Sequence, residues 1–189
     1  MTTNFSILAS AKALPTTKVT NQELTQLMAT SDDWIKQRTG IRSRHVATDE
    51  TTTSLAVSVA QQLLQQSRLA ATAIDLIIVA TMSPDYLTPA TAPQVQAAIG
   101  AEKAIAFDIN VACAGFVYGM QLVHQYLQPG QTALLIGSET LSRLVDWHDR
   151  STAVLFGDGA GGLLITAKPN TATGHWLGGH YATFGADGH

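Results

Sequence analysis

The sequence predicts a domain of the α/β class with a largely parallel central sheet. Continuous apolar runs of the kind that fully buried strands show, at 76–80 and 132–136, alternate with segments of helical periodicity. Strands that alternate with helices in this way are typical of parallel sheets. The chain has 189 residues, which is enough for a sizeable core in one large domain or two small ones.

The first half of the chain is predicted to contain a strand and three helices. Thr20 and Glu23 have the spacing of a capping box, which marks the start of a helix. Ser31 is a favourable N-cap for a second, short helix that Gly40 ends. The expected elements are a strand at 4–9, a helix from Thr20 to about residue 29, the short helix, and a helix at about 54–67.

The second half is predicted to lead through strands and helices to the only cysteine of the chain. After the buried strand at 76–80 come a proline-rich loop, a helix at about 92–99, a strand at 104–108 and then Cys113. The next helix, at 114–127, is apolar on nearly every side in its first turns, so we expect it to be buried all round. The glycine-rich last third is expected to form strands and turns around 156–162 and 163–167.

Composition excludes several functional classes. The formal net charge of −3 argues against a nucleic-acid surface, which needs a basic face. No apolar run is long enough to span a membrane, and the first residues lack the features of a signal peptide. A single cysteine excludes a disulfide within the chain and a cysteine-rich metal site. We therefore expect a cytoplasmic protein that binds neither nucleic acid nor membrane.

Cys113 is a candidate nucleophile because of where it stands. A strand runs into a sharp turn, and the cysteine lies at the start of the following helix, where unpaired N–H groups and the helix dipole favour a thiolate. Small neighbours leave room for a substrate carbonyl, and the N–H of Cys113 is a candidate oxyanion donor. A lone intracellular cysteine is more often a small core residue, and the local pattern leaves both readings open.

Four ordered blocks resemble beta-ketoacyl-acyl-carrier-protein synthase III, a family of thiolase-fold condensing enzymes. The resemblance covers essentially the whole chain from Leu14 onward. The blocks are Ala106-Phe107-Asp108 with Ala112-Cys113-Ala114-Gly115-Phe116; Thr30-Ser31-Asp32-Asp33-Trp34-Ile35 continuing to Arg38-Thr39-Gly40-Ile41-Arg42; Asp149-Arg150-Ser151-Thr152; and Phe156-Gly157-Asp158-Gly159-Ala160-Gly161.

The resemblance implies the initiating condensation of fatty-acid synthesis, an acyltransferase activity. Cys113 would take an acyl group, typically acetyl, from coenzyme A and condense it with malonyl-acyl-carrier-protein with loss of CO2. Coenzyme A thioesters are then substrates, no cofactor is permanently bound, and the partners are acyl carrier protein and a second subunit in a homodimer. The implied fold is one half of the duplicated thiolase-like αβαβα arrangement, so that residues 1–189 form an N-terminal domain whose C-terminal half is absent from this chain. In the whole fold the helix at 114–127 is enclosed between the two halves, so we expect this half alone to expose a large apolar face of it.

The resemblance also assigns binding residues. Trp34 and Arg150 would stack on the coenzyme A adenine, Thr30 would lie beside it, and Arg38 would lie near the phosphates. Flat indole and guanidinium faces and a fixed positive charge suit this ligand. Without the family, Trp34 reads more simply as an anchor for its helix and Arg150 as a surface charge.

Two further positions concern the acyl group. By resemblance, Phe156 lies close to the nucleophile and shapes the acyl pocket, and the loop at 83–89 crosses the dimer interface to close the partner's acyl tunnel. Thr88 occupies a position that often holds an aromatic residue, and we hypothesise that this smaller gate admits acyl groups longer than acetyl. The glycines at 157–161 lack the Gly-Lys-Ser/Thr of a phosphate-binding loop and are expected to permit a tight turn.

Related families and other functions compete with this interpretation. Hydroxymethylglutaryl-coenzyme A synthases use a glutamate just after the third strand, where Met82 stands here, which disfavours them. Polyketide and quinolone-forming relatives remain open, as does a non-catalytic acyl or coenzyme A binding module or a degenerate remnant.

The histidine and asparagine that complete the family's active site come from a second half, and no such segments occur in this chain. His124 lies on the helix of Cys113 but about 16 Å along it at 1.5 Å per residue, too far to act as its base. We expect the other histidines, at 45, 148, 175, 180 and 189, to be exposed or in loops. His175 and His180 lack a third ligand, so no metal site is predicted.

Overall fold

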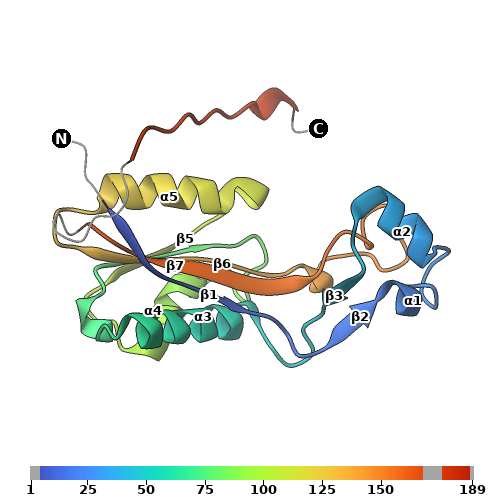
Figure 1. The fold of residues 1–189 in the computed structure, drawn as a ribbon, viewed down its shortest axis with the longest axis horizontal. Helices are drawn as coiled ribbons and strands as arrows, with labels where there is room; N and C mark the ends of the chain where they lie inside the picture. The colour runs from blue at the N-terminus through green and yellow to red at the C-terminus, as the bar shows by residue number, and fades with distance from the viewer. Residues whose placement is uncertain (1–4, 168–175, 188–189) are drawn as a thin grey trace.

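A five-stranded sheet forms the middle of three layers in the computed structural model, which describes residues 5–167 and 176–187 (Figure 1). The strand order is β1-β7-β6-β4-β5. β4 pairs in parallel with β5 and β6, whereas β7 is antiparallel to β6 and β1, so four of the five strands run in one direction. The α/β class with a mostly parallel sheet is confirmed. The strands are β1 (Ser6–Ala13), β4 (Leu76–Ala80), β5 (Ile105–Ile109), β6 (Thr132–Thr140) and β7 (Asp158–Thr166).

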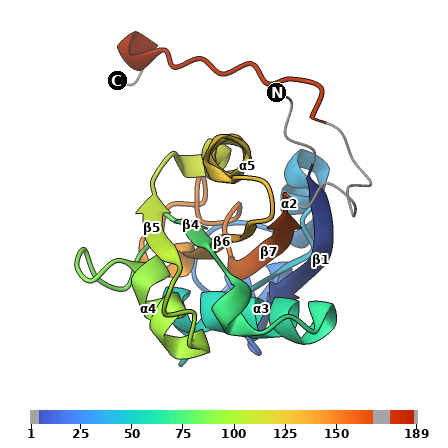
Figure 2. The same cartoon turned by 90° about the vertical axis from the view of Figure 1, so that its left-hand side faces the viewer.

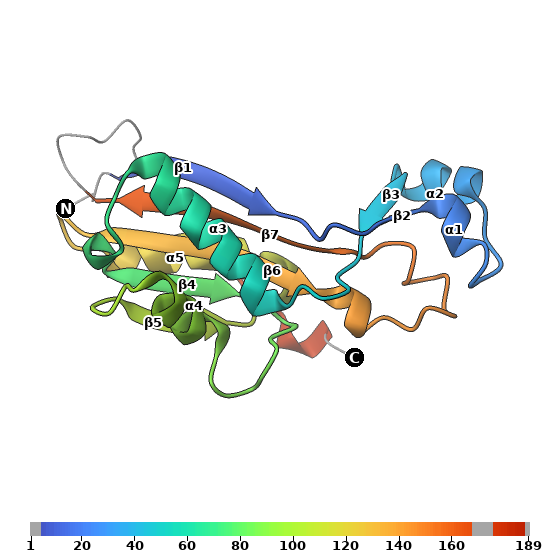
Figure 3. The same cartoon turned by 90° about the horizontal axis from the view of Figure 1, so that it is seen from below.

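Helices cover both faces of the sheet. Figure 2 shows α3 (Thr52–Ser67) and α4 (Thr91–Ile99) on one face and α5 (Gly115–Tyr126) on the other. The end of the sheet toward which the N-terminus of α5 points carries a smaller lobe (Figures 1 and 3). This end lobe comprises residues 18–45 and 144–156, and its elements are β2 (Lys18–Thr20), α1 (Asn21–Leu24), α2 (Asp32–Thr39) and β3 (Ser43–His45). Single 3₁₀ turns lie at Ala71–Ala73 (η1), Ala112–Ala114 (η2), Leu141–Arg143 (η3) and Gly185–Asp187 (η5).

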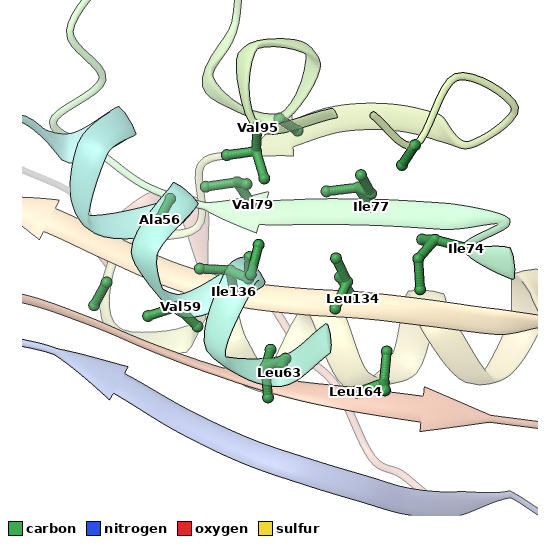
Figure 4. Close-up of a cluster of buried hydrophobic side chains, with 14 of the residues drawn as sticks. Ala56, Val59, Leu63, Ile74, Ile77, Val79, Val95, Leu134, Ile136 and Leu164 are labelled. Carbon is green, nitrogen blue, oxygen red and sulfur yellow. The ribbon is translucent and has the colours of Figure 1, made fainter. Parts of the chain in front are cut away.

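The main core lies between the sheet and α3. Every side chain of β4 is buried, because helices cover both of its faces, and this explains its continuous apolar sequence. Val59 and Leu63 of α3 pack over Ile136 and Leu164 of the sheet, as Figure 4 shows. A second cluster joins the opposite face of the sheet to α5, and a third holds the end lobe together around Leu24, Ile35 and Val154.

The capping box predicted at Thr20 is confirmed, but the helix that it starts is shorter than predicted. The Thr20 N–H donates to Glu23 Oε2 at 2.6 Å, and the Glu23 N–H donates to Thr20 Oγ1 at 3.3 Å. The helix α1 nevertheless ends at Leu24 and does not reach residue 29. The Thr25 hydroxyl donates to the Gln22 carbonyl at 2.7 Å, and the next backbone bonds span three residues, so this side chain competes with the helical pattern.

The predicted bounds of other elements differ mainly at their ends. β6 continues to Thr140 because it pairs with the whole length of β7, and β1 continues to Ala13, which pairs with Ala160 of β7. The α3 helix begins at Thr52, since Thr51 caps it by accepting a hydrogen bond from the Ser54 N–H at 3.0 Å. The short helix α2 has Ser31 as its N-cap and ends at Gly40, as predicted.

The helix after Cys113 is not buried all round in this chain, as expected when one half of the duplicated fold stands alone, although the apolar pattern by itself predicted full burial. Only Gly115, Gly119 and Val123 of α5 are buried, whereas Val117 is 57% exposed and Tyr126 is 50% exposed. The reason is that the sheet covers only one side of this helix (Figure 2). The apolar composition of α5 therefore leaves large apolar side chains at the surface of the described chain.

The glycine-rich segment forms a strand rather than the predicted tight turn. Gly159, Gly161 and Gly162 lie inside β7, between β1 and β6. A side chain at Gly162 would place its Cβ 2.8 Å from Val59 Cγ1 and 2.9 Å from the Leu135 carbonyl oxygen. Close packing of α3 on the sheet, and not turn formation, therefore requires glycine here. Among the described residues, no helix has the length and apolarity needed to cross a membrane.

Candidate active site

A strained turn places Cys113 between β5 and α5. The strand ends at Ile109, and Ala112 adopts φ +43°, in the left-handed region that side chains other than glycine disfavour. The 3₁₀ turn η2 then carries Cys113 directly into α5, and the cysteine side chain is exposed. The structure thus confirms that the cysteine stands at the entrance of a helix, within the single 3₁₀ turn that leads from the bend into α5.

Two glycines bring α5 close to the sheet below Cys113. A Cβ on Gly115 would lie 3.0 Å from Ala80 Cβ, and a Cβ on Gly119 would lie 2.4 Å from Leu135 Cδ1. Neither position has room for a side chain without movement of its neighbour. The height of the helix over β4 and β6, and with it the position of Cys113, is therefore set by these contacts.

Cys113 opens into a cavity of about 540 Å³. Its lining is mostly apolar and comes from the carboxyl ends of β4 and β6, from the start of α5 and from the segment that enters the end lobe. Apolar walls beside a nucleophile suit an acyl chain, and pockets of this kind are the usual binding sites of small molecules. Residues that line it include Met82, Cys113, Phe116, Glu139, Leu144 and Phe156.

The end lobe brings together three of the predicted nucleotide-binding residues. The guanidinium carbon of Arg38 lies 4.4 Å from the centre of the Trp34 ring, and that of Arg150 lies 4.9 Å from it. Arg150 Nη1 also donates to the Ala29 carbonyl at 2.9 Å, which fixes this side chain across the lobe. Next to Ala29, the buried Thr30 hydroxyl has no hydrogen-bond partner among the described residues. These four residues are candidates for nucleotide binding, and together we call them the nucleotide clamp: Thr30, Trp34, Arg38 and Arg150.

The two predicted acyl-pocket residues lie in different places. Phe156 lines the cavity of Cys113 and is 36% exposed. Thr88 lies in the exposed loop between β4 and α4 and does not line that cavity. Its neighbours Tyr86 and Leu87 are 62% and 96% exposed, so this loop projects from the chain. A role for Thr88 at a partner's tunnel stays a prediction.

None of the four described histidines lines the cavity, and the position of one of them differs from the prediction. His124 packs in an aromatic cluster, with ring centroids 4.5 Å from Trp176 and 5.8 Å from Phe5, and burial lowers the pKa of its imidazole. His45 is not in a loop but lies half-buried in β3, where its Nδ1 is 2.6 Å from the Pro15 carbonyl oxygen. The side chain of His148 is exposed, as is His180.

His175 and His189, which were predicted to be exposed or in loops, lie outside the described residues. The pair His175 and His180 therefore cannot be compared with the structure as a metal site. Within residues 5–167 and 176–187, no three His, Cys, Asp or Glu side chains gather in a way that could hold a metal ion.

Sequence reasoning missed Glu139, which lines the cavity together with Cys113. Its carboxylate accepts hydrogen bonds from the N–H groups of Met82 at 2.9 Å and Ser83 at 3.1 Å. The available signal was an acidic residue just beyond a buried strand, since ligand sites of parallel sheets gather at the carboxyl ends of their strands.

Comparison with known proteins extends the resemblance. The family model of 3-oxoacyl-[acyl-carrier-protein (ACP)] synthase III matches residues 107–185, a stretch that contains Cys113, Arg150 and Phe156. A beta-ketoacyl-[acyl-carrier-protein] synthase III of Levilactobacillus brevis is 60% identical over 187 residues, which are 98% of this chain and 57% of the relative. Nearly the whole chain is therefore similar to part of beta-ketoacyl-[acyl-carrier-protein] synthase III.

Solved structures agree with this similarity and confirm the thiolase-like fold. The 3-oxoacyl-[acyl-carrier-protein] synthase III of Aquifex aeolicus VF5 superposes with a TM-score of 0.83 at 43% identity, over 86% of this chain and 53% of that one. The priming beta-ketosynthase of the R1128 polyketide pathway also gives a TM-score of 0.83, at 31% identity, over 87% of this chain and 50% of that one. The chain thus spans about half the length of the relatives that it matches.

Proposed function

We propose that this chain carries the acyl-accepting half of a condensing enzyme that initiates fatty-acid synthesis. The single observation that carries the proposal is the position of Cys113, exposed at the entrance of α5 and open to an apolar cavity. The nucleotide clamp in the adjoining end lobe supports coenzyme A as the acyl donor, because it offers flat faces and two fixed positive charges.

In the proposed reaction, the Cys113 sulfur attacks the thioester carbonyl of an acyl-coenzyme A. The carbon–sulfur bond to coenzyme A breaks, the acyl group remains on Cys113, and the coenzyme A thiol leaves with a proton. Loss of CO2 from malonyl on acyl carrier protein then yields a carbanion, which attacks the Cys113 thioester. The products are a 3-oxoacyl chain on the carrier and the free cysteine.

The same proposal covers the remaining parts of the protein's role. Residues 1–189 are the N-terminal thiolase-like domain, and a second half provides the histidine and asparagine for decarboxylation, in agreement with the half-length match to the relatives. Acyl carrier protein is the partner, the protein acts in the cytoplasm as a homodimer, and coenzyme A thioesters serve as substrates with no permanently bound cofactor. Thr88 and Phe156 line the acyl path, Thr88 from across the dimer.

The test uses the complete gene product, since the proposal assigns decarboxylation to the second half. It is incubated with acetyl-coenzyme A and malonyl-acyl-carrier-protein, and the carrier is analysed by mass spectrometry. The 3-oxobutanoyl carrier should form, and the Cys113→Ala variant should form none. An acyl adduct on Cys113 without any 3-oxoacyl product would instead favour the acyl-binding module.

A polyketide-type priming condensation is the second candidate, favoured by the similarity to the R1128 priming beta-ketosynthase. The two candidates differ in the acyl donor and in the carrier protein that is used, not in the chemistry at Cys113. Competition between the fatty-acid carrier and a polyketide carrier in the same assay separates them. Preference for the polyketide carrier would replace the fatty-acid role.

A further inference from the structure

The carboxylate of Glu139 holds the turn that follows β4. Glu139 stands near the carboxyl end of β6, beside β4, with which β6 pairs in parallel. Its Oε1 accepts the Met82 N–H at 2.9 Å. Its Oε2 accepts the Ser83 N–H at 3.1 Å, the Thr81 hydroxyl at 3.3 Å and the Ser83 hydroxyl. All three residues of the segment 81–83 therefore bind one carboxylate.

These contacts give Glu139 a structural task rather than a chemical one. An ionised carboxylate only accepts hydrogen bonds, and here protein donors occupy both of its oxygens. Although Glu139 lines the cavity of Cys113, it is engaged with the neighbouring turn instead of being free to exchange a proton with a substrate.

Buried hydroxyls brace the same turn from the other side. The Ser83 hydroxyl oxygen accepts the Thr140 N–H at 2.9 Å, and the Ser83 carbonyl accepts the Thr52 hydroxyl at 2.6 Å. The Thr52 carbonyl in turn accepts the Ser138 hydroxyl at 2.7 Å. The turn is thus tied both to β6 and to the start of α3, and a network with all of its members satisfied is rigid.

Met82 is the one side chain of this turn that faces the substrate cavity. It lines the cavity together with Cys113 and is 40% exposed, whereas Thr81 and Ser83 are buried. Methionine is unbranched and flexible, so its place in the wall depends on the backbone from which it projects. Glu139 holds that backbone through the Met82 N–H.

We propose that Glu139 is a positioning residue that sets the acyl-group selectivity of Cys113 by fixing Met82 in the cavity wall. The proposal rests on the proposed function, because it needs acyl transfer to Cys113. With the turn fixed, Met82 limits the length of the acyl chain. Without the carboxylate, the backbone of the turn is less rigid, Met82 can move, and the cavity admits longer acyl chains.

The experiment measures selectivity in the acylation of Cys113. The 189-residue chain receives equimolar acetyl- and hexanoyl-coenzyme A, and intact-protein mass spectrometry gives the ratio of the two adducts at early times. In Glu139→Gln the amide replaces one acceptor oxygen with a donor, and the hexanoyl-to-acetyl ratio should rise about tenfold, the range that a single methylene contact controls. Glu139→Asp, which keeps the carboxylate, should recover most of the parent ratio.

A double-variant cycle tests whether Glu139 acts through Met82. Met82→Ala should raise the ratio by itself, and the Glu139→Gln/Met82→Ala chain should match Met82→Ala within about twofold. If the hexanoyl-to-acetyl ratio of the double variant instead rose by the product of the two single effects, the proposal would be overturned. Glu50→Gln is the matched control, because Glu50 also caps backbone N–H groups, of Thr16 and Thr48, but does not line the cavity.

Each remaining outcome decides the matter. A Glu139→Gln chain with the parent ratio overturns the inference and leaves the proposed function intact. A folded Glu139→Gln chain that accepts neither acyl group overturns it also, because Glu139 would then act in the chemistry. Should Glu139→Gln fail to fold, Ser83→Ala removes hydrogen bonds of the same turn, and an unchanged ratio there contradicts the proposal. A parent chain acylated by neither donor overturns the proposed function and the inference with it.

Discussion

The guanidinium of Arg150 lies 4.9 Å from the centre of the Trp34 ring and is held there by its hydrogen bond to the Ala29 carbonyl. Two distant segments of the chain thus meet in one small surface next to the cavity of Cys113. Because of this contact, Arg150 and Trp34 together form a candidate adenine site. Trp34 can therefore bind a ligand or only anchor its helix. Substitution of Trp34 separates these two interpretations, because they predict different effects.

Trp34→Ala should weaken coenzyme A binding with little effect on folding of the sheet. Stacking of a base on an aromatic ring contributes about 1–3 kcal/mol, so we expect the dissociation constant to rise about tenfold, measured by isothermal titration calorimetry. Trp147→Phe is the control, since Trp147 packs in the same lobe. Unchanged affinity with a lower melting temperature would show that Trp34 is only an anchor.

Thr88→Phe should narrow the acyl selectivity of the complete protein. If the loop at 83–89 closes a partner's tunnel, a phenyl ring there excludes longer primers and leaves acetyl transfer intact. The ratio of branched-chain to acetyl turnover should fall about tenfold. Thr48→Phe is the control, because Thr48 lies in the connection from β3 to α3 and outside the cavity lining. Equal ratios in Thr88→Phe and the parent would refute the gate.

Gly119→Ala should destabilise the chain and slow acylation of Cys113. The added Cβ would lie 2.4 Å from Leu135 Cδ1, so the leucine must move or α5 must rise from the sheet. Overpacking of this kind costs about 1–3 kcal/mol, to be measured by urea denaturation. Gly185→Ala is the control, because no atom lies within 4 Å of the Cβ it would gain. Equal stability of the Gly119→Ala chain and the parent would contradict the close packing.

The stability of the chain should fall below neutral pH in part because of His124. Burial lowers the pKa of this imidazole from 6.5, so the unfolded state binds the proton more readily than the folded state. Stability should therefore rise with pH below about 6.5, and His124→Phe should flatten this dependence. Urea midpoints at about pH 5.5 and about pH 7.5 measure it. His148→Gln, at an exposed site, should leave the slope unchanged; a parent slope retained in His124→Phe would contradict the assignment.

The sequence predicts best those features that depend on local chemistry. β4 is recognised because all five of its side chains are buried and apolar. The cap at Thr20 follows from Glu23 three positions later, and the cap at Ser31 follows from the residue type. Cys113 and the clamp residues lie in family blocks. The sequence also predicts the sharp turn between the strand and the helix that carries Cys113.

The features that the sequence does not reveal depend on contacts between distant segments. Glu139 binds the turn at 81–83 across more than fifty residues, and no local pattern marks that contact. The glycine-rich sequence of β7 is typical of a turn, yet at Gly162 the close contacts with Val59 of α3 and with the Leu135 carbonyl require glycine. The exposure of α5 depends on what covers its outer side, which the periodicity of one helix does not specify.

The most direct test of the account is intact-protein mass spectrometry of the 189-residue chain after incubation with acetyl-coenzyme A. We predict a single acetyl adduct on the parent and none on Cys113→Ala, because this chain contains Cys113, the cavity into which it opens and the four residues proposed to bind the nucleotide. A folded parent chain that acquires no adduct, or an adduct that persists in Cys113→Ala, would contradict the claim that Cys113 is the acyl acceptor of this site.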